Sequence, residues 1–301
     1  MSAPSKILIS GGTGLIGKQL RRQLSEQKIS CVLLSRTVKN MEFPVFQWNP
    51  DIGDLNLQAL EGVDTIVNLA GEPVAEKRWS SQRKMEIIQS RIKSIDTLYN
   101  ALKSGKHSVK TLISASATGF YGDSGEDWVD ENSPPGKDFL GRTCQEWENS
   151  LKRIQNLGIR VVILRIGFVL AKNGGALPVL KKQVNFFAAS ALGSGKQFIS
   201  WVHIDDVCRL IIQAIQNEKM IGVYNAVAPS PVSNKNMIQA LAQTLHRPFW
   251  PFTVPSVLLR LILGEKADII LHGQKVSASK VLKTNFVFQY NDLNECLRDV
   301  V

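Results

Sequence analysis

The chain has 301 residues and a formal net charge of +10, with 44% hydrophobic and 21% charged residues. This is an ordinary globular composition, long enough to bury a large core, and it excludes a disordered or fibrous chain. No apolar run approaches membrane-spanning length, and the first apolar strand begins too early for a signal peptide. We therefore expect a cytoplasmic protein with no membrane partner.

The positive charge by itself fits a nucleic-acid binder. However, the sequence has no run of five or more basic residues and no interleaving of basic with aromatic residues. We favour a basic surface that attracts an anionic cofactor and substrate, and we expect no nucleic-acid partner. The four cysteines form no CxxC pair and the four histidines lack metal-ligand spacing, so we expect reduced thiols and no metal.

Residues 7–17 run from an apolar strand through a glycine-rich turn into a helix. Gly11 permits the tight turn, Gly14 lets the backbone approach a pyrophosphate, and Gly17 lets the helix pack on the sheet. The positive end of that helix would point at the phosphates. The stretch predicts a dinucleotide site on the first turn of a doubly wound parallel sheet, the alternative being a glycine-rich turn in another βαβ unit.

The residues after the second strand, 31–34, indicate which nucleotide is bound. An NAD site usually has Asp or Glu there, about twenty residues past the glycines. This chain has Ser35 and Arg36, and no acid before Glu42. An Arg fork and a Ser hydroxyl bind a 2′-phosphate that a carboxylate would repel, so we predict NADP(H) rather than NAD(H). The alternative is that Arg36 stacks on the adenine or faces solvent.

Strands and helices alternate through the first half of the chain. A polar, turn-rich stretch follows the second strand, and the later elements are predicted at 63–71 (strand), 81–103 (long helix), 110–116 (strand), 146–155 (helix) and 160–166 (strand). The long helix has one apolar stripe, made by Met85, Ile88, Ile92, Ile95, Tyr99 and Leu102. This order predicts an α/β fold with a doubly wound parallel sheet.

The second half is less regular. Its expected elements are an apolar helix near 177–191, a helix at 207–216, a strand at 222–226 and a short buried helix within 257–263. We predict a nucleotide-binding domain from 1–168 and about 200–228. Residues 169–199 and 229–301 would form a smaller, mostly helical C-terminal substrate lobe.

The motifs SGGTGLIG, VNLAGE, SASATGFYG, LRIGFVL, GSGKQFISWVHIDDV, PSVLLRLILGEKAD and GQKV follow one another in this order. Together they resemble an atypical extended short-chain dehydrogenase/reductase. The similarity is to the "epimerase family protein" group (SulA-like, nucleoside-diphosphate-sugar-epimerase-like), over essentially the whole chain. The resemblance implies a Rossmann domain with NADP(H) lying across the strand ends.

The resemblance also implies which residues contact the cofactor. It places Gly11, Gly12, Thr13, Gly14, Leu15 and Ile16 at the pyrophosphate, Ser35 and Arg36 at the 2′-phosphate, and Leu69, Ala70, Gly71 and Glu72 beside the ribose and nicotinamide. Glu86 and Arg91 on the long helix would reach the cofactor, or instead belong to a solvated helix face. Val169 would lie near the nicotinamide.

Relatives use a Ser together with a Tyr placed four residues before a Lys, where the Tyr transfers a proton. Ser116 matches that Ser, at the end of a buried strand where open α/β sheets place their chemistry. The Tyr-Lys pair is missing, because the matching helix has Phe139 and Leu140, which cannot transfer a proton. The pair Tyr99 and Lys103 has the right spacing but precedes the Ser strand.

Tyr121 is the nearest phenol in sequence, and we hypothesise that Ser116 and Tyr121 contact a substrate. His203, followed by Asp205 and Asp206, invites an acid–base role, but we favour a structural histidine because no partner is evident.

Two classes of function stay open. The first is an NADP-dependent oxidoreductase or epimerase-type enzyme on an unknown small molecule, with Ser116, Tyr121 or an ordered water as its acid. The second is an NADP(H)-binding sensor or interaction protein without turnover. A standard sugar-nucleotide 4-epimerase is disfavoured because that reaction needs the Tyr base. Whether the protein forms a homodimer also stays open.

Overall fold

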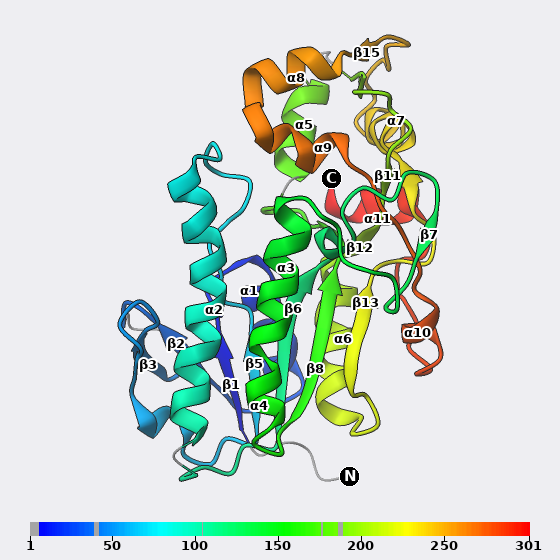
Figure 1. The fold of residues 1–301 in the computed structure, drawn as a ribbon. Coiled ribbons are helices and arrows are strands. Elements are labelled where there is room, and N and C mark those ends of the chain that lie inside the picture. The colour runs from blue at the N-terminus through cyan, green and yellow to red at the C-terminus, as the bar shows by residue number, and fades with distance from the viewer. Residues whose placement is uncertain (1–5, 39–41, 104, 176, 186–188) are drawn as a thin grey trace.

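The computed structural model describes residues 6–38, 42–103, 105–175, 177–185 and 189–301. In these ranges an eight-stranded sheet has the order β4-β3-β2-β1-β5-β6-β8-β13, parallel except for the β3–β4 pair (Figure 1). Its strands are β1 Ile7–Ser10, β2 Cys31–Ser35, β3 Val45–Asn49, β4 Asp54–Leu55, β5 Thr65–Asn68, β6 Thr111–Ala117, β8 Arg160–Ile166 and β13 Gly222–Ala226. The strand order reverses between β1 and β5, where doubly wound sheets bind their ligands.

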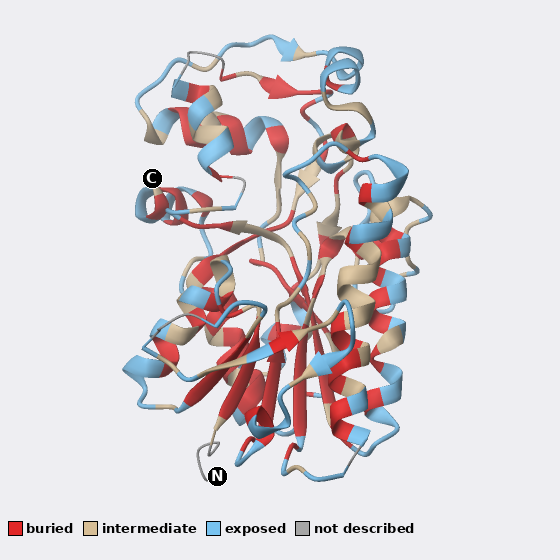
Figure 2. Cartoon of the chain, turned by 90° about the vertical axis from the view of Figure 1, so that its left-hand side faces the viewer, coloured by how far each residue is buried: buried red, intermediate tan, exposed pale blue. Residues whose placement is uncertain are grey.

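Helices cover both faces of this sheet. α1 (Leu15–Glu26) and α6 (Ile204–Gln216) lie on one face, and α2 (Ser81–Lys103), α3 (Phe139–Ser150) and α4 (Lys152–Gln155) lie on the other (Figure 1). A separate apolar cluster joins each set of helices to the strands. Figure 2 shows the strands buried and the helices exposed on their outer sides, as expected for a sheet covered on both faces.

The second half adds short strand pairs and helices. The pairs are β9 Phe168–Leu170 with β12 Trp201–His203, β10 Ala191–Leu192 with β15 Thr253–Val254, β11 Phe198–Ile199 with β14 Val232–Ser233, and β16 Lys275–Val276 with β7 Trp128–Val129. The helices are α5 Leu177–Asn185, α7 Asn234–Thr244, α8 Ser256–Leu263, α9 Asp268–Leu271, α10 Ser279–Leu282 and α11 Leu293–Val300, and the 3-10 turns are η1 Leu57–Leu60, η2 Thr118–Tyr121 and η3 Gly264–Ala267. A third apolar cluster around Trp201 joins α5, α7 and α11. The predicted division into two domains stays a prediction.

The predicted parallel strands and the long helix are confirmed in type and place. The helix predicted at 146–155 starts earlier, at Phe139, because Asp138 accepts the amide hydrogen of Gly141 and caps it. The apolar stripe on α2 is partly wrong: Met85 is 54% exposed, while Ile87 and Leu98 are fully buried. The polar stretch after the second strand, which was predicted as turns, contains β3. Its polar residues interrupt the alternation of apolar and polar residues that would have indicated a strand.

The helix expected within 257–263 forms as α8, but it is not buried. Leu259 is the one buried residue along it. The predicted helix near 177–191 is described over Leu177–Asn185, and residues 186–188 lie outside the described residues. Within the described ranges, no helix is long and apolar enough to cross a membrane, and no group of three metal-binding side chains gathers.

The structure gives His203 partners that the sequence did not show, and a structural role stays our interpretation. Its side chain is 2% exposed, its Nδ1 accepts the amide hydrogen of Asp205, and its Nε2 lies 3.1 Å from the carboxylate of Asp299. Asp206 is fully buried and accepts the amide hydrogens of Gln289 and Tyr290. The WVHIDD segment therefore caps α6 and holds the C-terminal part of the chain to it.

Candidate functional site

The turn between β1 and α1 packs directly on the chain that leaves β5. Gly11 has a φ of +70°, and a Cβ there would lie 2.7 Å from the carbonyl carbon of Leu69. A Cβ at Gly17 would lie 2.4 Å from the carbonyl oxygen of Gly11. Both positions therefore exclude a side chain. Gly14 caps α1, whose first turn has no acidic residue, so its amides and positive dipole end stay available to an anion.

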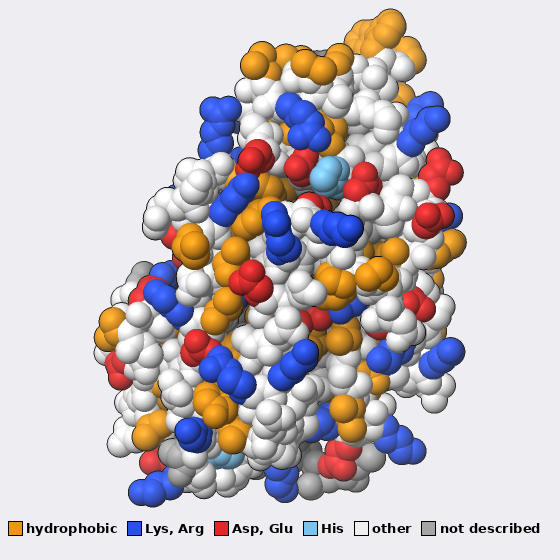
Figure 3. Space-filling model, viewed as in Figure 1, with side chains coloured by type: hydrophobic (Ala, Val, Ile, Leu, Met, Phe, Trp, Pro, Cys, Tyr) orange, Lys and Arg blue, Asp and Glu red, His pale blue; other side chains and the backbone are white. Residues whose placement is uncertain are grey.

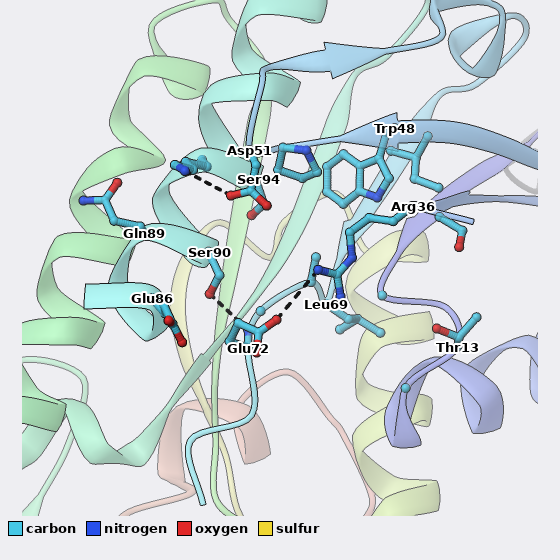
Figure 4. A pocket seen from close by; sticks show the side chains of 18 of the residues that line it. Thr13, Arg36, Trp48, Asp51, Leu69, Glu72, Glu86, Gln89, Ser90 and Ser94 are labelled. Carbon is cyan, nitrogen blue, oxygen red and sulfur yellow. Dashed lines mark hydrogen bonds and ion pairs between the residues drawn. The ribbon is translucent and has the colours of Figure 1, made fainter. Parts of the chain in front are cut away.

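A cavity of about 870 Å³ opens at this turn, where the sheet order reverses. It lies between the glycine turn, the ends of β2 and β5, and α2 (Figure 4). The predicted residues that line it are Gly11, Thr13, Gly14, Ser35, Arg36, Leu69, Ala70, Gly71, Glu72 and Glu86. Its volume and open polar wall suit an extended dinucleotide.

Arg36 lies at the end of β2 with 70% of its side chain exposed. Its Nη1 is 3.9 Å from the carboxylate of Glu72, and Figure 4 shows the two side chains pointing toward one another. Ser35 instead hydrogen-bonds to the backbone of Thr37, donating to its carbonyl at 2.8 Å. The carboxylate near Arg36 thus comes from beyond β5, which the spacing after the glycines could not reveal.

Arg83 on α2 holds two of the cavity's carboxylates. Its side chain is 6% exposed, and its Nη1 donates at 3.0 Å to both Glu72 and Glu86. Its Nη2 donates to the carbonyl of Pro73 at 2.7 Å. The hydrogen bond from Arg83 lowers the pKa of Glu86 below its usual value. A buried guanidinium therefore balances the negative charge on this wall.

One wall of the cavity was not predicted from the sequence. Trp48 and Pro50, from β3 and the turn after it, line the cavity together with Asp51. Asp51 accepts a hydrogen bond from Lys93 of α2 at 3.0 Å, which joins the turn to the helix across the cavity. Nothing in the local sequence marks these residues, because their meeting depends on how β3 and α2 pack.

Five predicted cofactor residues lie outside the cavity lining: Gly12, Leu15, Ile16, Arg91 and Val169. Ile16 and Val169 pack against the apolar cluster of the α1 side. Arg91 donates to the carbonyl of Ile87, and its guanidinium lies 5.0 Å from the ring centre of Trp147. Cofactor contact by these five stays a prediction.

The comparisons with known proteins agree with this fold. A model of the NAD dependent epimerase/dehydratase family matches residues 7–226, and a domain of unknown function (DUF1731) matches residues 254–300. The chain belongs to the NAD-dependent epimerase/dehydratase family. The predicted resemblance is thereby confirmed.

Relatives in this family match the chain over nearly its whole length. The SDR39U1 homolog, chloroplastic, of Arabidopsis thaliana is 38% identical, covering 98% of this chain and 86% of that protein. The epimerase family protein YfhF of Bacillus subtilis is 34% identical, covering 98% and 97%. The crystal structure of human epimerase family protein SDR39U1 (isoform 2) with NADPH has a TM-score of 0.87 at 27% identity, covering 98% of both chains.

The chemistry expected of a family member would lie at the ends of β6, β8 and β13, where a buried polar network forms. Ser116 donates to Glu148 at 2.6 Å, and Arg165 donates to both oxygens of Glu148, at 2.9 and 2.8 Å. Register pairs Ser116 with Arg165 and Arg165 with Asn225 across the three strands. The serine thus already has a carboxylate partner.

Tyr121 belongs to the same network. Its hydroxyl donates to Asn225 at 2.6 Å and accepts from Arg165 at 3.0 Å. Burial raises the pKa of Tyr121 to about 12. At neutral pH this phenol is therefore protonated, and it can act as a hydrogen-bond donor but not as the base that the family's Tyr provides.

The residues at the positions of the family's Tyr-Lys segment, Phe139 and Leu140, offer no replacement base. Leu140 lies against the turn that follows β6, since a Cβ at Gly119 would be 3.4 Å from its Cβ. Phe139 packs edge-on against Trp79, with ring centres 4.8 Å apart. Burial raises the pKa of Cys144, four residues past Leu140, to about 12, so its thiol is protonated at neutral pH.

Proposed function

We propose that this chain binds NADP(H) in the cavity at the glycine turn and acts as an oxidoreductase or epimerase-like enzyme on a small molecule. The observation that carries the cofactor assignment is the position of Arg36, mostly exposed at the mouth of the cavity beside Ser35. A planar guanidinium there can bind a 2′-phosphate through two parallel hydrogen bonds. The NADPH in the human SDR39U1 structure supports this assignment.

Glu72 does not argue against a phosphate beside Arg36. Its second carboxylate oxygen already accepts from Arg83, which is buried and shared with Glu86. Among the charged residues that line the cavity, the cations Arg36, Lys77, Arg83 and Lys93 exceed the carboxylates Asp51, Glu72 and Glu86 by one. Binding would let Arg36 exchange a 3.9 Å ion pair for closer contacts with the phosphate.

The test compares Arg36→Ala with Arg22→Ala by titration with NADPH and NADH. Arg22 is a matched control, because it is 62% exposed and also has a carboxylate at 3.9 Å, but lies on the outer side of α1. Losing charge-assisted hydrogen bonds worth about 1.5–3 kcal/mol should weaken NADPH binding roughly 10- to 100-fold in Arg36→Ala. NADH binding should change little, and Arg22→Ala should bind both like the unaltered protein.

An equal loss of NADPH and NADH affinity in Arg36→Ala would show that Arg36 stacks on the adenine. Unchanged preference would remove Arg36 from cofactor selection altogether.

Within this proposal, Ser116 and Tyr121 are the candidate groups for contact with the substrate. Each now donates its one hydroxyl hydrogen inside the protein, to Glu148 and Asn225, so donation to a substrate requires that it exchange this partner. The alternative is an NADP(H)-binding sensor without turnover, which the apolar Phe139 and Leu140 at the family's base position favour. Absorbance of bound NADPH, followed after addition of a panel of aldehydes and ketones, distinguishes the two. Oxidation that slows in Ser116→Ala supports the enzyme, whereas full turnover in Tyr121→Phe would remove Tyr121 from the mechanism.

A further inference from the structure

The end of the lobe away from the sheet carries a concentration of exposed apolar side chains. We define the apical surface by its members: Trp250, Phe252, Val257, Leu258, Leu261 and Ile262, which are between 45% and 77% exposed. Four of them lie on α8 at positions i, i+1, i+4 and i+5, so they share one side of that helix. Figure 3 shows hydrophobic side chains gathered at this tip, over α8 and the β15 segment.

An apolar surface of this kind is unusual on a chain that stands alone in water. Single exposed apolar residues are normal, but a contiguous patch of several hundred Å² usually marks an interaction site. Six large side chains at these exposures amount to several hundred Å², since the two aromatic ones alone would bury about 150–250 Å² each if fully covered. None of these six belongs to the neighbouring apolar cluster, which is built on Leu192, Leu259 and Ala267.

The chain segments that carry the apical surface are mainly basic, although Glu265 and Asp268 follow α8 and Asp268 pairs with Arg260 at 2.8 Å. Residues 171–200 and 229–264, which include α5, α7, β15 and α8, contain seven Lys and Arg and no Asp or Glu. The rest of the chain holds all 26 acidic residues. Lys182, Lys196 and Lys235 are exposed. These two ranges therefore carry +7 of the net charge of +10.

We propose that the apical surface docks on an anionic lipid bilayer, with its aromatic and aliphatic side chains inserted at the headgroup level. Trp and Phe beside Leu and Ile, flanked by Lys and Arg, are the combination that binds membrane interfaces peripherally. The early expectation of no membrane partner rested on the lack of a long apolar run, which peripheral docking does not require.

A second copy of the chain fits this surface less well. A two-fold contact places the same patch against itself, so the basic residues of one lobe would face those of the other. Like charges brought together in this way repel, while an anionic bilayer neutralises them. The charge pattern therefore favours the bilayer.

Flotation with vesicles tests the proposal on the full chain. Vesicles of phosphatidylcholine with an equal share of phosphatidylglycerol should carry the protein at low salt, and phosphatidylcholine alone should carry much less. The double variant Phe252→Asp, Leu261→Asp should lower the bound fraction roughly ten-fold or more, because it removes two inserted side chains. Raising the salt should weaken binding by screening the lysines.

The matched control is Ile221→Asp, which alters an apolar side chain that is 60% exposed next to β13, away from α8. It should float like the unaltered protein. Because the altered side chains lie in solvent, both variants should melt normally and keep their cofactor binding, whichever way the cofactor test turns out. No binding to anionic vesicles at low salt would overturn the proposal, as would a dimer in sedimentation that Phe252→Asp, Leu261→Asp abolishes.

Discussion

Gly11 and Gly53 share a backbone φ of +70°, but their surroundings differ. A Cβ at Gly11 would lie 2.7 Å from the backbone of Leu69, whereas a Cβ at Gly53 would meet nothing within 4 Å. Gly11 is therefore required twice, by its conformation and by the close approach of β1 to the chain that follows β5. Comparing Gly11 with Gly53 therefore separates the effect of the left-handed conformation from the effect of close packing.

We expect Gly53→Ala to destabilise the fold by about 1 kcal/mol, the cost of a left-handed residue with a Cβ. Gly11→Ala should cost roughly 3 kcal/mol or more, because displacing the backbone of Leu69 adds an overpacking penalty. It should also weaken NADPH binding, since the turn lines the cavity. Urea denaturation measures both differences in the free energy of unfolding, and equal losses in the two variants would refute the packing argument.

How far the sequence predicts this site depends on whether neighbours in space are neighbours in the chain. The glycine turn and Arg36 were predicted because the strand, the turn and the helix that make the motif are contiguous. Trp48, Asp51 and Lys93 were missed because they come together at the cavity only when β3 and the turn after it pack beside α2. Glu72 was named, but its place opposite Arg36 was not predicted, since that approach crosses β1, which lies between β2 and β5.

At the scale of elements, the parallel strands were predictable because both of their faces are buried and their apolar runs are continuous. The α2 stripe was partly wrong because its first turns pass the polar cavity and only its later turns lie on the sheet. In the first turns, Arg83 and the carboxylates that it binds take the place of apolar contacts with the sheet. The burial of α8 was also mispredicted, since an apolar helix has no sequence feature that tells an uncovered surface from a core.

A buried ion pair between Glu148 of α3 and Arg165 of β8 connects this helix to the sheet. The two side chains are 10% and 4% exposed. Glu148→Gln should destabilise the fold by about 3–5 kcal/mol, because it leaves a buried guanidinium without its charge partner. Replacing both residues, by Glu148→Leu with Arg165→Met, should recover much of that loss.

Asp96→Asn on α2 is the control, since Asp96 pairs with Arg153 near the surface and should cost less than about 1 kcal/mol. Chemical denaturation of the four proteins gives the free energies. A Glu148→Gln protein as stable as the unaltered one would mean that the pair contributes nothing to the joint between α3 and the sheet.

At the scale of the molecule, the lobe touches the segment that borders the cofactor cavity. Glu265 of η3 forms an ion pair with Lys84 of α2, and Lys266 donates to the carbonyl of Ala75 at 3.0 Å. A Cβ at Gly264 would lie 3.3 Å from the side chain of Arg78. Arg83, which holds the cavity's carboxylates, is the residue before Lys84. A ligand that orders the cavity wall should therefore also slow local opening of residues 264–271.

We expect NADPH to slow amide hydrogen exchange in residues 72–90 and, through these contacts, in residues 264–271. Ligand binding raises the free energy of local opening wherever the opened form binds less well. In Glu265→Gln the protection of 264–271 should shrink while that of 72–90 persists, because only the link to the lobe is weakened. Glu26→Gln, which breaks the exposed pair with Arg22 on α1, should change neither. If NADPH leaves 264–271 unprotected in the unaltered protein, residues 264–271 and the cavity are independent of one another.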